Sequence, residues 1–599
     1  MNIQSYNIEE LTTLAEDIRA RILDTVSKNG GHLSSTLGAT DLIVAMHKVF
    51  DPKNDPFLFD VSHQAYAHKL LTNRWESFST LRQFGGTCGY TKPSESESDY
   101  YVAGHSSTSI SLAVGAAKAI ALKGENRVPV AFIGDGSMSA GMVYEAMNEL
   151  GDRKYPVVII LNDNEMSIAK PIGAISKLLS QTMAGSFYQK FKGKVEKALE
   201  HFPESATYMA KKFEESFKLI TPGILFQELG IEYIGPVDGH DIESLIETMK
   251  VAKALGKPVI IHAQTTKGKG YEIAEGTKEH WHGVGSFDPK TGESVKKSGA
   301  KSATAIFSDT LVELADSDDK LVGVTAAMPS GTGMSAVMEK YPERFWDVAI
   351  AEQHAVTSMG PLAKEGFKPF CTIYSTFLQR GYDQVIHDIA LMDLGVAFAI
   401  DRAGIVGEDG ETHQGVFDIS FLRTVPNMTL LAPYNETTMK LSMEFAKEYN
   451  HPCAFRYPRG AFTAEDRVSP PYELGKSVLL QEGEEILFIG YGDGVGRAEK
   501  TSKLLDKKIA ILDLRFVKPL DEEMLVTLSS HYKKWYVFSD SAKMGGVGSA
   551  ILEFLSEKKI QDIILTSFEY DDAFITHGNT KLVEESLGLL PEQLAKKIS

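Results

Sequence analysis

Two short apolar runs that both end in oxygen-bearing side chains constrain the fold of this chain more than any other feature. The first is Val130-Ala-Phe-Ile-Gly-Asp-Gly-Ser137, and the second is Val157-Val-Ile-Ile-Leu-Asn-Asp-Asn164. Runs of this length and composition are typical of strands that are buried on both faces of a parallel sheet. Because open α/β sheets bind ligands at the carboxyl ends of their strands, we expect both polar ends at one site.

Asp135 and Asn164, which lie 29 residues apart, offer a carboxylate and an amide oxygen to a hard cation. Mg²⁺ takes one or two protein oxygens and completes its octahedron with phosphate oxygens and water. The glycines that flank Asp135 allow backbone N–H groups to approach a phosphate closely. Gly-Asp-Gly alone is more typical of a turn, but its pairing with a second strand of this kind favours a diphosphate-bearing cofactor held by Mg²⁺.

Helical and strand patterns alternate along the chain in three stretches, which predicts an α/β protein of three doubly wound domains with mostly parallel sheets. Turn-forming segments without periodicity place the domains at residues 1–300, 301–470 and 471–599. Residues 176–219 are Lys/Glu-rich and have a helical pattern, so we interpret them as an excursion from the first sheet.

The apolar spacing of Leu11–Ser27 predicts the first helix, which Gly30-Gly31 ends. Further helices are expected at Ala303–Leu314 and Phe377–Met392. Further strands are expected at Pro258–His262, Leu321–Thr325, Asp347–Ala351, Val396–Asp401, Met428–Leu431, Ile486–Ile489, Ile509–Leu512, Trp535–Ser539 and Ile563–Thr566.

Composition excludes several classes of protein. The net charge of −18 argues against general binding to nucleic acids or anionic membranes. Three scattered cysteines form neither a disulfide framework nor a zinc pattern, which suits a reducing compartment. The N-terminal residues show no secretion signal, and no apolar run approaches the roughly 20 residues that span a bilayer. We therefore expect a cytoplasmic protein.

Glu352 stands where an apolar stretch, Ala349-Ile-Ala, is expected to pass from a strand into a helix. A glutamate in the first turn of a helix is usually explained by the helix dipole. In thiamine-diphosphate enzymes, however, a glutamate in this setting hydrogen-bonds the aminopyrimidine ring of the cofactor. Together with the Asp135 and Asn164 pattern, this makes Glu352 a candidate catalytic carboxylate.

Histidines and arginines supply the remaining candidates. His32, His63 and His105 follow glycines or predicted strand ends in the same α/β stretch as Asp135, where a neutral imidazole can donate to a diphosphate or move a proton. A Gly-rich loop runs from Asp401 to His413 and is typical of a functional sheet edge. Side chains available to hold a phosphate are Arg380, Arg402 and Arg459.

These features resemble the 1-deoxy-D-xylulose-5-phosphate synthase family of transketolase-like thiamine-diphosphate enzymes over nearly the whole chain. The strings that carry the resemblance are Gly30-Gly-His-Leu, His63-Gln-Ala-Tyr-Ala-His-Lys69, Gly104-His-Ser-Ser-Thr-Ser-Ile-Ser111, Asn162-Asp-Asn-Glu-Met-Ser-Ile168, Gly235-Pro-Val-Asp-Gly-His240, Ala351-Glu-Gln-His-Ala355, Tyr374-Ser-Thr-Phe-Leu-Gln-Arg380, Asp401 to Gly415, Arg456-Tyr-Pro-Arg-Gly460 and Leu514-Arg-Phe-Val-Lys-Pro-Leu520.

The resemblance implies a set of cofactor contacts. Asp135, Asn164 and the carbonyl of Met166 would ligate Mg²⁺. Phe377 would stack on the pyrimidine of thiamine diphosphate, and Ile168 would support its bent shape. Residues implied around the diphosphate and thiazolium are His63, Gly104, His105, Ser106, Gly136, Ser137, Asn164, Lys267 and Tyr271.

The resemblance also implies the reaction, in which pyruvate is decarboxylated and condensed with D-glyceraldehyde 3-phosphate to give 1-deoxy-D-xylulose 5-phosphate and CO₂. This is the first step of non-mevalonate isoprenoid supply. His32, His282 and His413 would act near the reacting carbonyls, and Glu352 at the pyrimidine. Residues implied for the acceptor and its phosphate are Tyr374, Arg380, Asp409, His413 and Arg459, with Arg402 as a further candidate. The family places its active site between the first two domains and forms a homodimer.

Two alternatives stay open on the sequence alone. Val61-Ser-His63 lacks the glycine that this family usually has before the histidine, which leaves room for a paralogue. One alternative is a transketolase-like enzyme that transfers a two-carbon ketol between sugar phosphates. The other is a non-catalytic paralogue, against which the intact Asp135, Asn164 and Glu352 argue. Dinucleotide binding is excluded because no G-x-G-x-x-G follows a strand.

Overall fold

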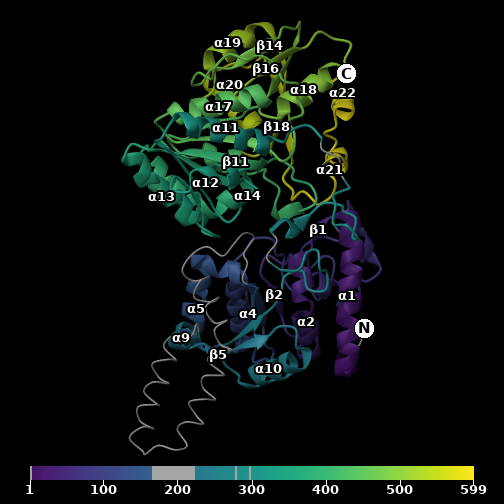
Figure 1. Cartoon of the computed structure of the whole chain (residues 1–599). Helices are drawn as coiled ribbons and strands as arrows, with labels where there is room; N and C mark the ends of the chain where they lie inside the picture. Colours follow the sequence, from purple (N-terminus) through teal and green to yellow (C-terminus); the bar gives the residue numbers. More distant parts are fainter. Residues whose placement is uncertain (1–2, 165–222, 277–278, 296–298) are drawn as a thin grey trace, which may run out of the picture. The chain divides into compact units, whose positions relative to one another are not determined.

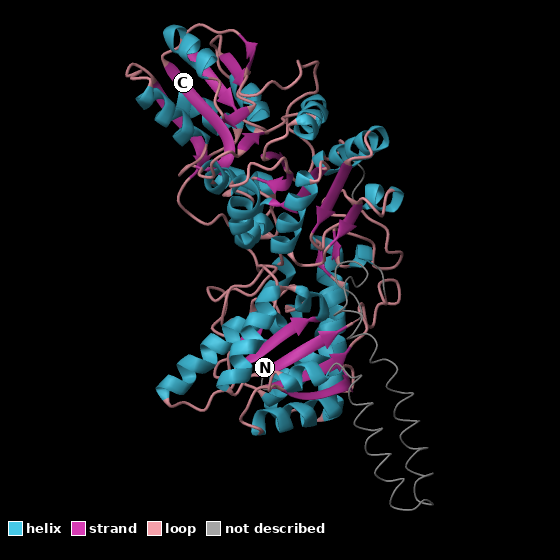
Figure 2. Ribbon diagram, turned by 90° about the vertical axis from the view of Figure 1, so that its left-hand side faces the viewer, coloured by secondary structure: helices cyan, strands magenta, loops and turns pink. Residues whose placement is uncertain are grey.

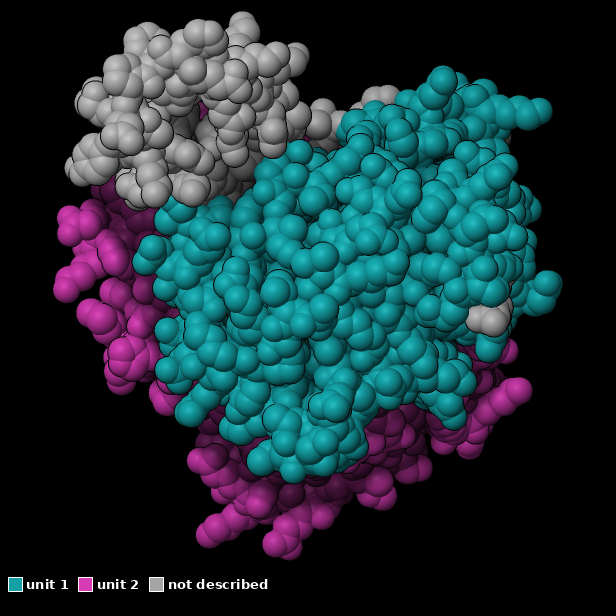
Figure 3. All heavy atoms as spheres, turned by 90° about the horizontal axis from the view of Figure 1, so that it is seen from below, with its two compact units in different colours: residues 1–81, 87–296 teal, residues 82–86, 297–599 magenta. Residues whose placement is uncertain are grey.

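The chain forms two compact units in the computed structural model, which describes residues 3–164, 223–276, 279–295 and 299–599. Unit 1 comprises residues 1–81 and 87–296, and unit 2 comprises residues 82–86 and 297–599; Figure 3 colours them teal and magenta. The predicted excursion at 176–219 lies outside the described residues. Among the helices in the described ranges, none combines the length and apolar character that a membrane crossing requires.

Unit 1 is built on a parallel sheet whose strands follow the order β2-β3-β4-β6-β5. Figure 1 labels its two edge strands, β2 and β5. Gly134 of β3 pairs with Asn162 of β4, so the strand ends that carry Asp135 and Asn164 are neighbours, as the two apolar runs predict. The bounds are β2 Phe57–Phe59, β3 Val130–Gly134, β4 Val158–Asp163, β5 Glu232–Asp238 and β6 Val259–Gln264.

Helices cover both faces of this sheet because alternate side chains of each strand point to opposite sides. Val130 and Phe132 pack with one group of helices, and Ala131 and Ile133 pack with the other. The first group is α1 Ile8–Asn29, α2 Ser34–Val49, α3 Tyr66–Leu71 and α10 Ile242–Ala254. The second group is α4 Ser109–Lys123, α5 Gly141–Arg153 and α9 Gly223–Glu228. The doubly wound prediction is confirmed for this unit.

A short antiparallel pair brings two distant parts of unit 1 together. Helix α1 ends at Asn29, and Gly30 follows with a φ of 77°, which confirms the predicted stop. The chain then enters β1 (Gly31–His32), which pairs with β7 (Gly283–Val284). This pairing places His32 opposite Gly283, beside His282.

Unit 2 contains a larger sheet in the order β17-β12-β13-β11-β10-β8-β9, parallel except for the edge strand β17. Its strands are β8 Leu321–Thr325, β9 Phe345–Asp347, β10 Lys368–Tyr374, β11 Ala397–Ala403, β12 Thr429–Leu431, β13 Cys453–Pro458 and β17 Phe516–Lys518. One face packs on α11 Ala303–Ser317, α12 Ser335–Lys340 and α17 Glu436–Glu448. The other packs on α13 Glu352–Lys364, α14 Ser375–Leu378 and α16 Asp418–Arg423.

The C-terminal part of unit 2 forms a second mostly parallel sheet in the order β14-β16-β15-β18-β19, with β14 antiparallel; Figure 2 draws the strands in magenta. Its strands are β14 Val478–Gln481, β15 Ile486–Gly490, β16 Ala510–Asp513, β18 Lys534–Ala542 and β19 Ile564–Tyr570. Its helices are α18 Gly494–Ser502, α19 Glu522–His531, α20 Val547–Glu557, α21 Thr580–Ser586 and α22 Pro591–Ile598. The predicted α/β class with mostly parallel sheets is confirmed.

Two predicted elements are wrong in detail. The strand expected at Asp347–Ala351 ends at Asp347 instead, because Ala349 takes a left-handed φ of 62° and turns the chain before α13 begins at Glu352. The single helix expected at Phe377–Met392 is irregular, since α14 gives way to short helical turns and then to a π-helical turn over Val385–Ala390.

Candidate active site

The edge of the unit 1 sheet carries the predicted cation ligands. Burial, together with the nearby Asp163 carboxylate, raises the pKa of the Asp135 carboxyl to about 8. The buried Oδ1 of Asn164 has no hydrogen-bond partner among the described residues. A buried carboxyl beside an unsatisfied amide oxygen fits a bound divalent cation, because such an ion satisfies both. The third predicted ligand, the Met166 carbonyl, lies outside the described residues, as does Ile168.

Three predicted histidines form a cluster in unit 1. The ring centroid of His32 lies 5.4 Å from that of His63 and 5.6 Å from that of His282, and His63 and His282 are 5.0 Å apart. Burial lowers the pKa of His282 well below its ordinary value, and the charge of Lys267 adds to this. The His282 imidazole is therefore neutral at pH 7 and able to exchange a proton with a substrate oxygen.

The loop that carries Gly104, His105 and Ser106 is anchored by a residue that the sequence analysis did not identify. Asp60, buried at the end of β2, accepts hydrogen bonds from the backbone N–H groups of Ser107 and Ser109 at 2.7 and 3.1 Å. The Ser107 hydroxyl donates to the carbonyl of Ser137 at 2.9 Å. These bonds tie the Gly104–Ser106 loop to the turn that holds Gly136 and Ser137.

Lys267 and Tyr271 follow β6, and the structure places them differently. Lys267 is 4% exposed, and its charge lowers the pKa values of both Asp135 and His282, so it lies near both groups. The Tyr271 hydroxyl donates to the Pro289 carbonyl at 2.9 Å, and its ring packs on Trp281. Of the two, only Lys267 faces the charged groups of the site.

Glu352 begins α13 in unit 2 and is buried. Its Oε2 has no hydrogen-bond partner in the described part of the chain, and Nη1 of Arg380 lies 3.7 Å from it. Burial raises the pKa of the Glu352 carboxyl, although the Arg380 charge opposes this. A carboxyl of raised pKa with one unsatisfied oxygen suits a hydrogen bond to a basic ring nitrogen.

Aromatic side chains gather near the carboxyl end of β10. The rings of Tyr374 and Phe377 stack at 5.4 Å, and the His413 ring meets Phe377 edge-on at 5.5 Å. The Arg402 guanidinium lies 4.1 Å from the centre of the Tyr374 ring and donates to the Gly331 carbonyl at 2.6 Å. Burial lowers the pKa of His413. The predicted candidates of this region are therefore brought together within unit 2.

A charged group adjoins these aromatic residues. Asp409 Oδ1 pairs with Arg82 at 3.1 Å, and Asp409 Oδ2 lies 3.9 Å from Arg459. Arg459 also pairs with Glu408 at 3.2 Å, and its side chain is 39% exposed. Arg82 was missed by the sequence analysis because it precedes Asp409 by more than 300 residues. The two arginines are balanced by two carboxylates here, and Arg459, the exposed one, can offer its guanidinium to a phosphate.

A buried chain of hydrogen bonds in unit 1 was also missed by the sequence analysis. Asp163 accepts from Nε2 of His262 at 2.8 Å, and the Tyr233 hydroxyl meets Nδ1 of the same ring at 2.8 Å. The signal for it was the Asn162-Asp-Asn164 string, in which only the last residue was given a role. These hydrogen bonds hold the Asp163 carboxylate near Asp135.

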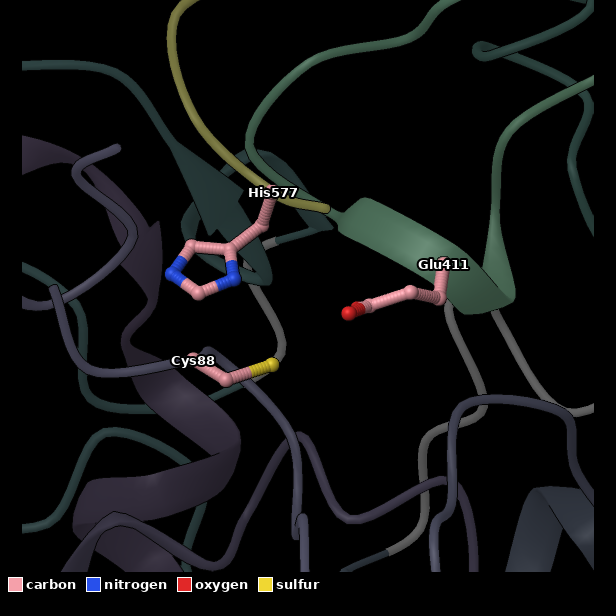
Figure 4. Close-up of side chains that lie close together, drawn as sticks. All are labelled: Cys88, Glu411 and His577. Carbon is pink, nitrogen blue, oxygen red and sulfur yellow. The ribbon is translucent and has the colours of Figure 1, made fainter. Parts of the chain in front are cut away.

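Cys88, Glu411 and His577, drawn in Figure 4, belong to different units, since Cys88 lies in unit 1 and the other two lie in unit 2. We therefore assign no metal site to them. Within unit 2, the His577 ring contacts the carbonyl of Gly86 at 3.1 Å.

Comparison with known proteins identifies the family. Residues 1–265 match the model described as 1-deoxy-D-xylulose-5-phosphate synthase, 300–464 the transketolase pyrimidine-binding domain, and 475–594 the transketolase C-terminal domain. A protein from Sulfurimonas denitrificans named 1-deoxy-D-xylulose-5-phosphate synthase is 69% identical and covers 100% of this chain and 99% of its own. The chain belongs to the 1-deoxy-D-xylulose-5-phosphate synthase family.

Two further relatives bear the same name. The protein from Nitratiruptor sp. is 69% identical, with 100% of this chain and 99% of its own covered, and that from Aliarcobacter butzleri is 65% identical, with 100% of each covered. The family resemblance expected from the motifs is thus confirmed. The predicted class, a thiamine-diphosphate- and Mg²⁺-dependent transferase of the transketolase type, is confirmed with it.

Proposed function

We propose that this chain decarboxylates pyruvate and condenses the remaining two-carbon unit with D-glyceraldehyde 3-phosphate, giving 1-deoxy-D-xylulose 5-phosphate and CO₂. The observation that carries the proposal is full-length identity of 65–69% to relatives named for this product. Buried acceptors at Asn164 and Glu352 that lack a hydrogen-bond partner among the described residues support it, as does the raised pKa of the buried Asp135, because a non-catalytic paralogue would have no use for them.

The unit 1 residues bind the cofactor. Asp135 and Asn164 hold Mg²⁺, with the Met166 carbonyl as the expected third protein ligand. Lys267 neutralises the negative charge of a diphosphate because its ammonium is buried near Asp135. The donors around the diphosphate are His63, Gly104, His105, Ser106, Gly136 and Ser137, while Tyr271, whose hydroxyl is engaged by Pro289, supports the segment that carries Lys267.

Bound thiamine diphosphate supplies the electron sink that decarboxylation of a 2-oxo acid needs. Glu352 holds a proton at a pyrimidine nitrogen, for which its raised pKa suits it. Phe377 provides the flat apolar face for that ring. The imidazoles of His282 and His413, whose pKa values burial lowers, are suited to pass a proton to an oxygen of the substrate, and His32 lies beside His282.

The unit 2 arginines bind the phosphate of the acceptor. Arg459 is 39% exposed, so its guanidinium can exchange its bond to Glu408 for a bond to a phosphate. Arg380 and Asp409 contribute charge of both signs near the acceptor hydroxyls, and Tyr374 contributes its hydroxyl. Arg402 is engaged by Gly331, Asp401 and the Tyr374 ring, so its role is to hold that ring.

The chain is expected to act as a homodimer in the cytoplasm. The homodimer is what the family resemblance implies. The three cysteines are free thiols, which supports a reducing compartment. Sedimentation of the purified protein tests the dimer.

The deciding experiment measures CO₂ release from pyruvate with Mg²⁺ and thiamine diphosphate, with and without D-glyceraldehyde 3-phosphate. Release that rises sharply with the aldehyde, together with a five-carbon deoxyketose phosphate, is the expected result. No CO₂ release from pyruvate, together with turnover of a ketose phosphate, would instead establish two-carbon ketol transfer.

A further inference from the structure

His240 belongs to the Gly235-Pro-Val-Asp-Gly-His240 string, for which the proposed reaction has no role. It lies between β5 and α10, and its side chain is 16% exposed. Its Nδ1 is 2.7 Å from Oδ2 of Asp41, and its Nε2 accepts the backbone N–H of Thr266 at 2.8 Å. Both ring nitrogens are therefore engaged by parts of unit 1 that are far apart in sequence.

These contacts fix the tautomer of the His240 ring. A backbone N–H can only donate, so Nε2 carries no proton and the neutral ring holds its proton on Nδ1, which donates to Asp41. Asp41 lies on α2 and pairs with Arg19 of α1, whose Nε also donates to the Leu37 carbonyl at 3.2 Å. Burial would raise the pKa of the Asp41 carboxyl, but the bond from His240 and the charge of Arg19 hold it below its ordinary value.

Thr266, whose backbone N–H donates to His240, immediately precedes Lys267. Gly268, on the other side of Lys267, donates its N–H to the Ser34 carbonyl at 2.8 Å, and the Lys267 carbonyl accepts from Gly276 at 2.9 Å. A Cβ on Gly38 would lie 2.7 Å from the Thr266 carbonyl oxygen, so α2 packs directly against this backbone. The Lys267 backbone is thus held from both sides, and His240 supplies a side-chain contact on the Thr266 side.

We propose that His240 is a positioning residue: through the Thr266 backbone it sets where the buried Lys267 ammonium stands, and so how tightly the chain binds a diphosphate. The inference rests on the proposed function, in which Lys267 contacts the diphosphate of the cofactor. Lys267 is 4% exposed, so a small shift of its backbone cannot be absorbed by solvent and moves its charge relative to Asp135 and His282.

The first test compares two amide variants that each keep half of the contact. The His240→Gln oxygen can stand near the Nε2 position and accept from Thr266. The His240→Asn amide nitrogen stands near Nδ1, donates to Asp41 and leaves the Thr266 N–H without an acceptor. Thiamine diphosphate binding at fixed Mg²⁺, measured by calorimetry, should weaken about tenfold in His240→Asn and by less than about threefold in His240→Gln. Equal losses in both variants would overturn the proposal.

A double-mutant cycle separates positioning from general structural damage. In a Lys267→Met background, His240→Asn should change thiamine diphosphate affinity by less than about twofold, because the charge that it positions is gone. Losses that simply add would mean that His240 does not act through Lys267. His451→Gln removes an exposed imidazole–carboxylate pair to Asp393 and is the matched control, with no expected change.

The outcomes distinguish this inference from the proposed function. If the unmodified chain does not bind thiamine diphosphate with Mg²⁺, or Lys267→Met binds it normally, the proposed role of Lys267 fails first. If Lys267→Met weakens binding and His240→Asn does not, only the inference fails. Should His240→Asn not fold, Asp41→Asn takes its place: it keeps an acceptor for Nδ1 but loses the charge, and it must show the same non-additivity with Lys267→Met.

Discussion

Unit 1 contains two buried charged regions that differ in whether their acceptor oxygens have hydrogen-bond partners. Asp99 is fully buried and accepts from Arg74 at 2.6 and 2.7 Å, from His68 at 3.0 Å and from the Lys92 backbone at 2.7 Å. These partners overcome the effect of burial and lower its pKa. At the sheet edge, burial raises the pKa of Asp135 to about 8, and Asn164 Oδ1 has no hydrogen-bond partner among the described residues.

The difference distinguishes buried charges that stabilise the fold from those whose hydrogen bonds a bound ligand would complete. A buried carboxylate whose oxygens are all used by donors, as in Asp99, is held rigidly and has no acceptor left for a ligand. A buried group with an unsatisfied acceptor is destabilising in the isolated chain and is retained where a ligand completes its hydrogen bonds. Glu352 in unit 2 belongs to the second kind, because its Oε2 lacks a hydrogen-bond partner in the described ranges and burial raises its pKa. His68 belongs to the first kind, although it is as buried as any residue of the site.

The largest effect is expected at Glu352. Glu352→Ala should lower kcat toward the upper end of the roughly 10²–10⁴-fold range of positioned acid–base groups, because it removes a buried carboxyl of raised pKa with an unsatisfied oxygen. Its thermal midpoint should equal or exceed that of the unmodified chain, since an incompletely satisfied buried group is removed. Steady-state kinetics and thermal unfolding check this. Glu365→Ala, an exposed change just past the end of α13, is the control, and near-native activity of Glu352→Ala would contradict the assigned role.

Asp99 should show the opposite pattern. Asp99→Asn leaves Arg74 buried beside a neutral group, so the free energy of unfolding should fall by about 3–5 kcal/mol while activity per folded molecule stays near native. Because the folded pKa of Asp99 is lowered, its stabilising contribution is present above the unfolded value of about 3.9 and is lost as pH falls through and below it. Denaturant unfolding between pH 7 and pH 3 should show this loss in the unmodified chain and not in Asp99→Asn.

Asp135 should combine a loss of ligand binding with a gain of stability. Asp135→Asn should abolish the stabilisation by Mg²⁺ and thiamine diphosphate, which is about 2.7 kcal/mol at a hundred times Kd. The folded pKa near 8 lies above the unfolded value of about 3.9, so the metal-free chain loses stability as pH rises from about 4 to about 8. The asparagine removes this dependence. Thermal unfolding with and without ligands at pH 5 and pH 8 measures both effects, and a variant that still gains stability from Mg²⁺ would remove Asp135 from the ligand set.

What could be predicted from the sequence was local in character. The apolar runs that became β3 and β4 carry their own polar ends, so the neighbouring positions of Asp135 and Asn164 followed from strand pattern alone. Helix α1 and its stop at Gly30 followed from spacing and one glycine. Glu352, Arg380, Arg402 and Arg459 were candidates from local patterns, while Tyr374, Phe377, Asp409 and His413 were given roles by the family resemblance. The structure brings many of them together within unit 2.

What could not be predicted depends on contacts across long stretches of chain. Asp60 and Ser107 are 47 residues apart, and Asp163 and His262 are 99 apart, so no local pattern relates them. Strand β17 comes from the 471–599 stretch but pairs with β12, which spacing along the chain does not reveal. The left-handed turn at Ala349 was missed because alanine carries no signal for a positive φ.

The smallest effect is expected at Arg459, which tests whether a partly satisfied, exposed charge also serves the site. Its bond to Glu408 at 3.2 Å lies in an exposed position, so the residue adds little to stability. Arg459→Ala should raise KM for D-glyceraldehyde 3-phosphate about tenfold, the lower end for a charge-assisted bond. KM for unphosphorylated D-glyceraldehyde should stay the same, and Arg459→Lys should recover part of the loss. An equal rise for both aldehydes would mean that Arg459 shapes the acceptor site without binding the phosphate.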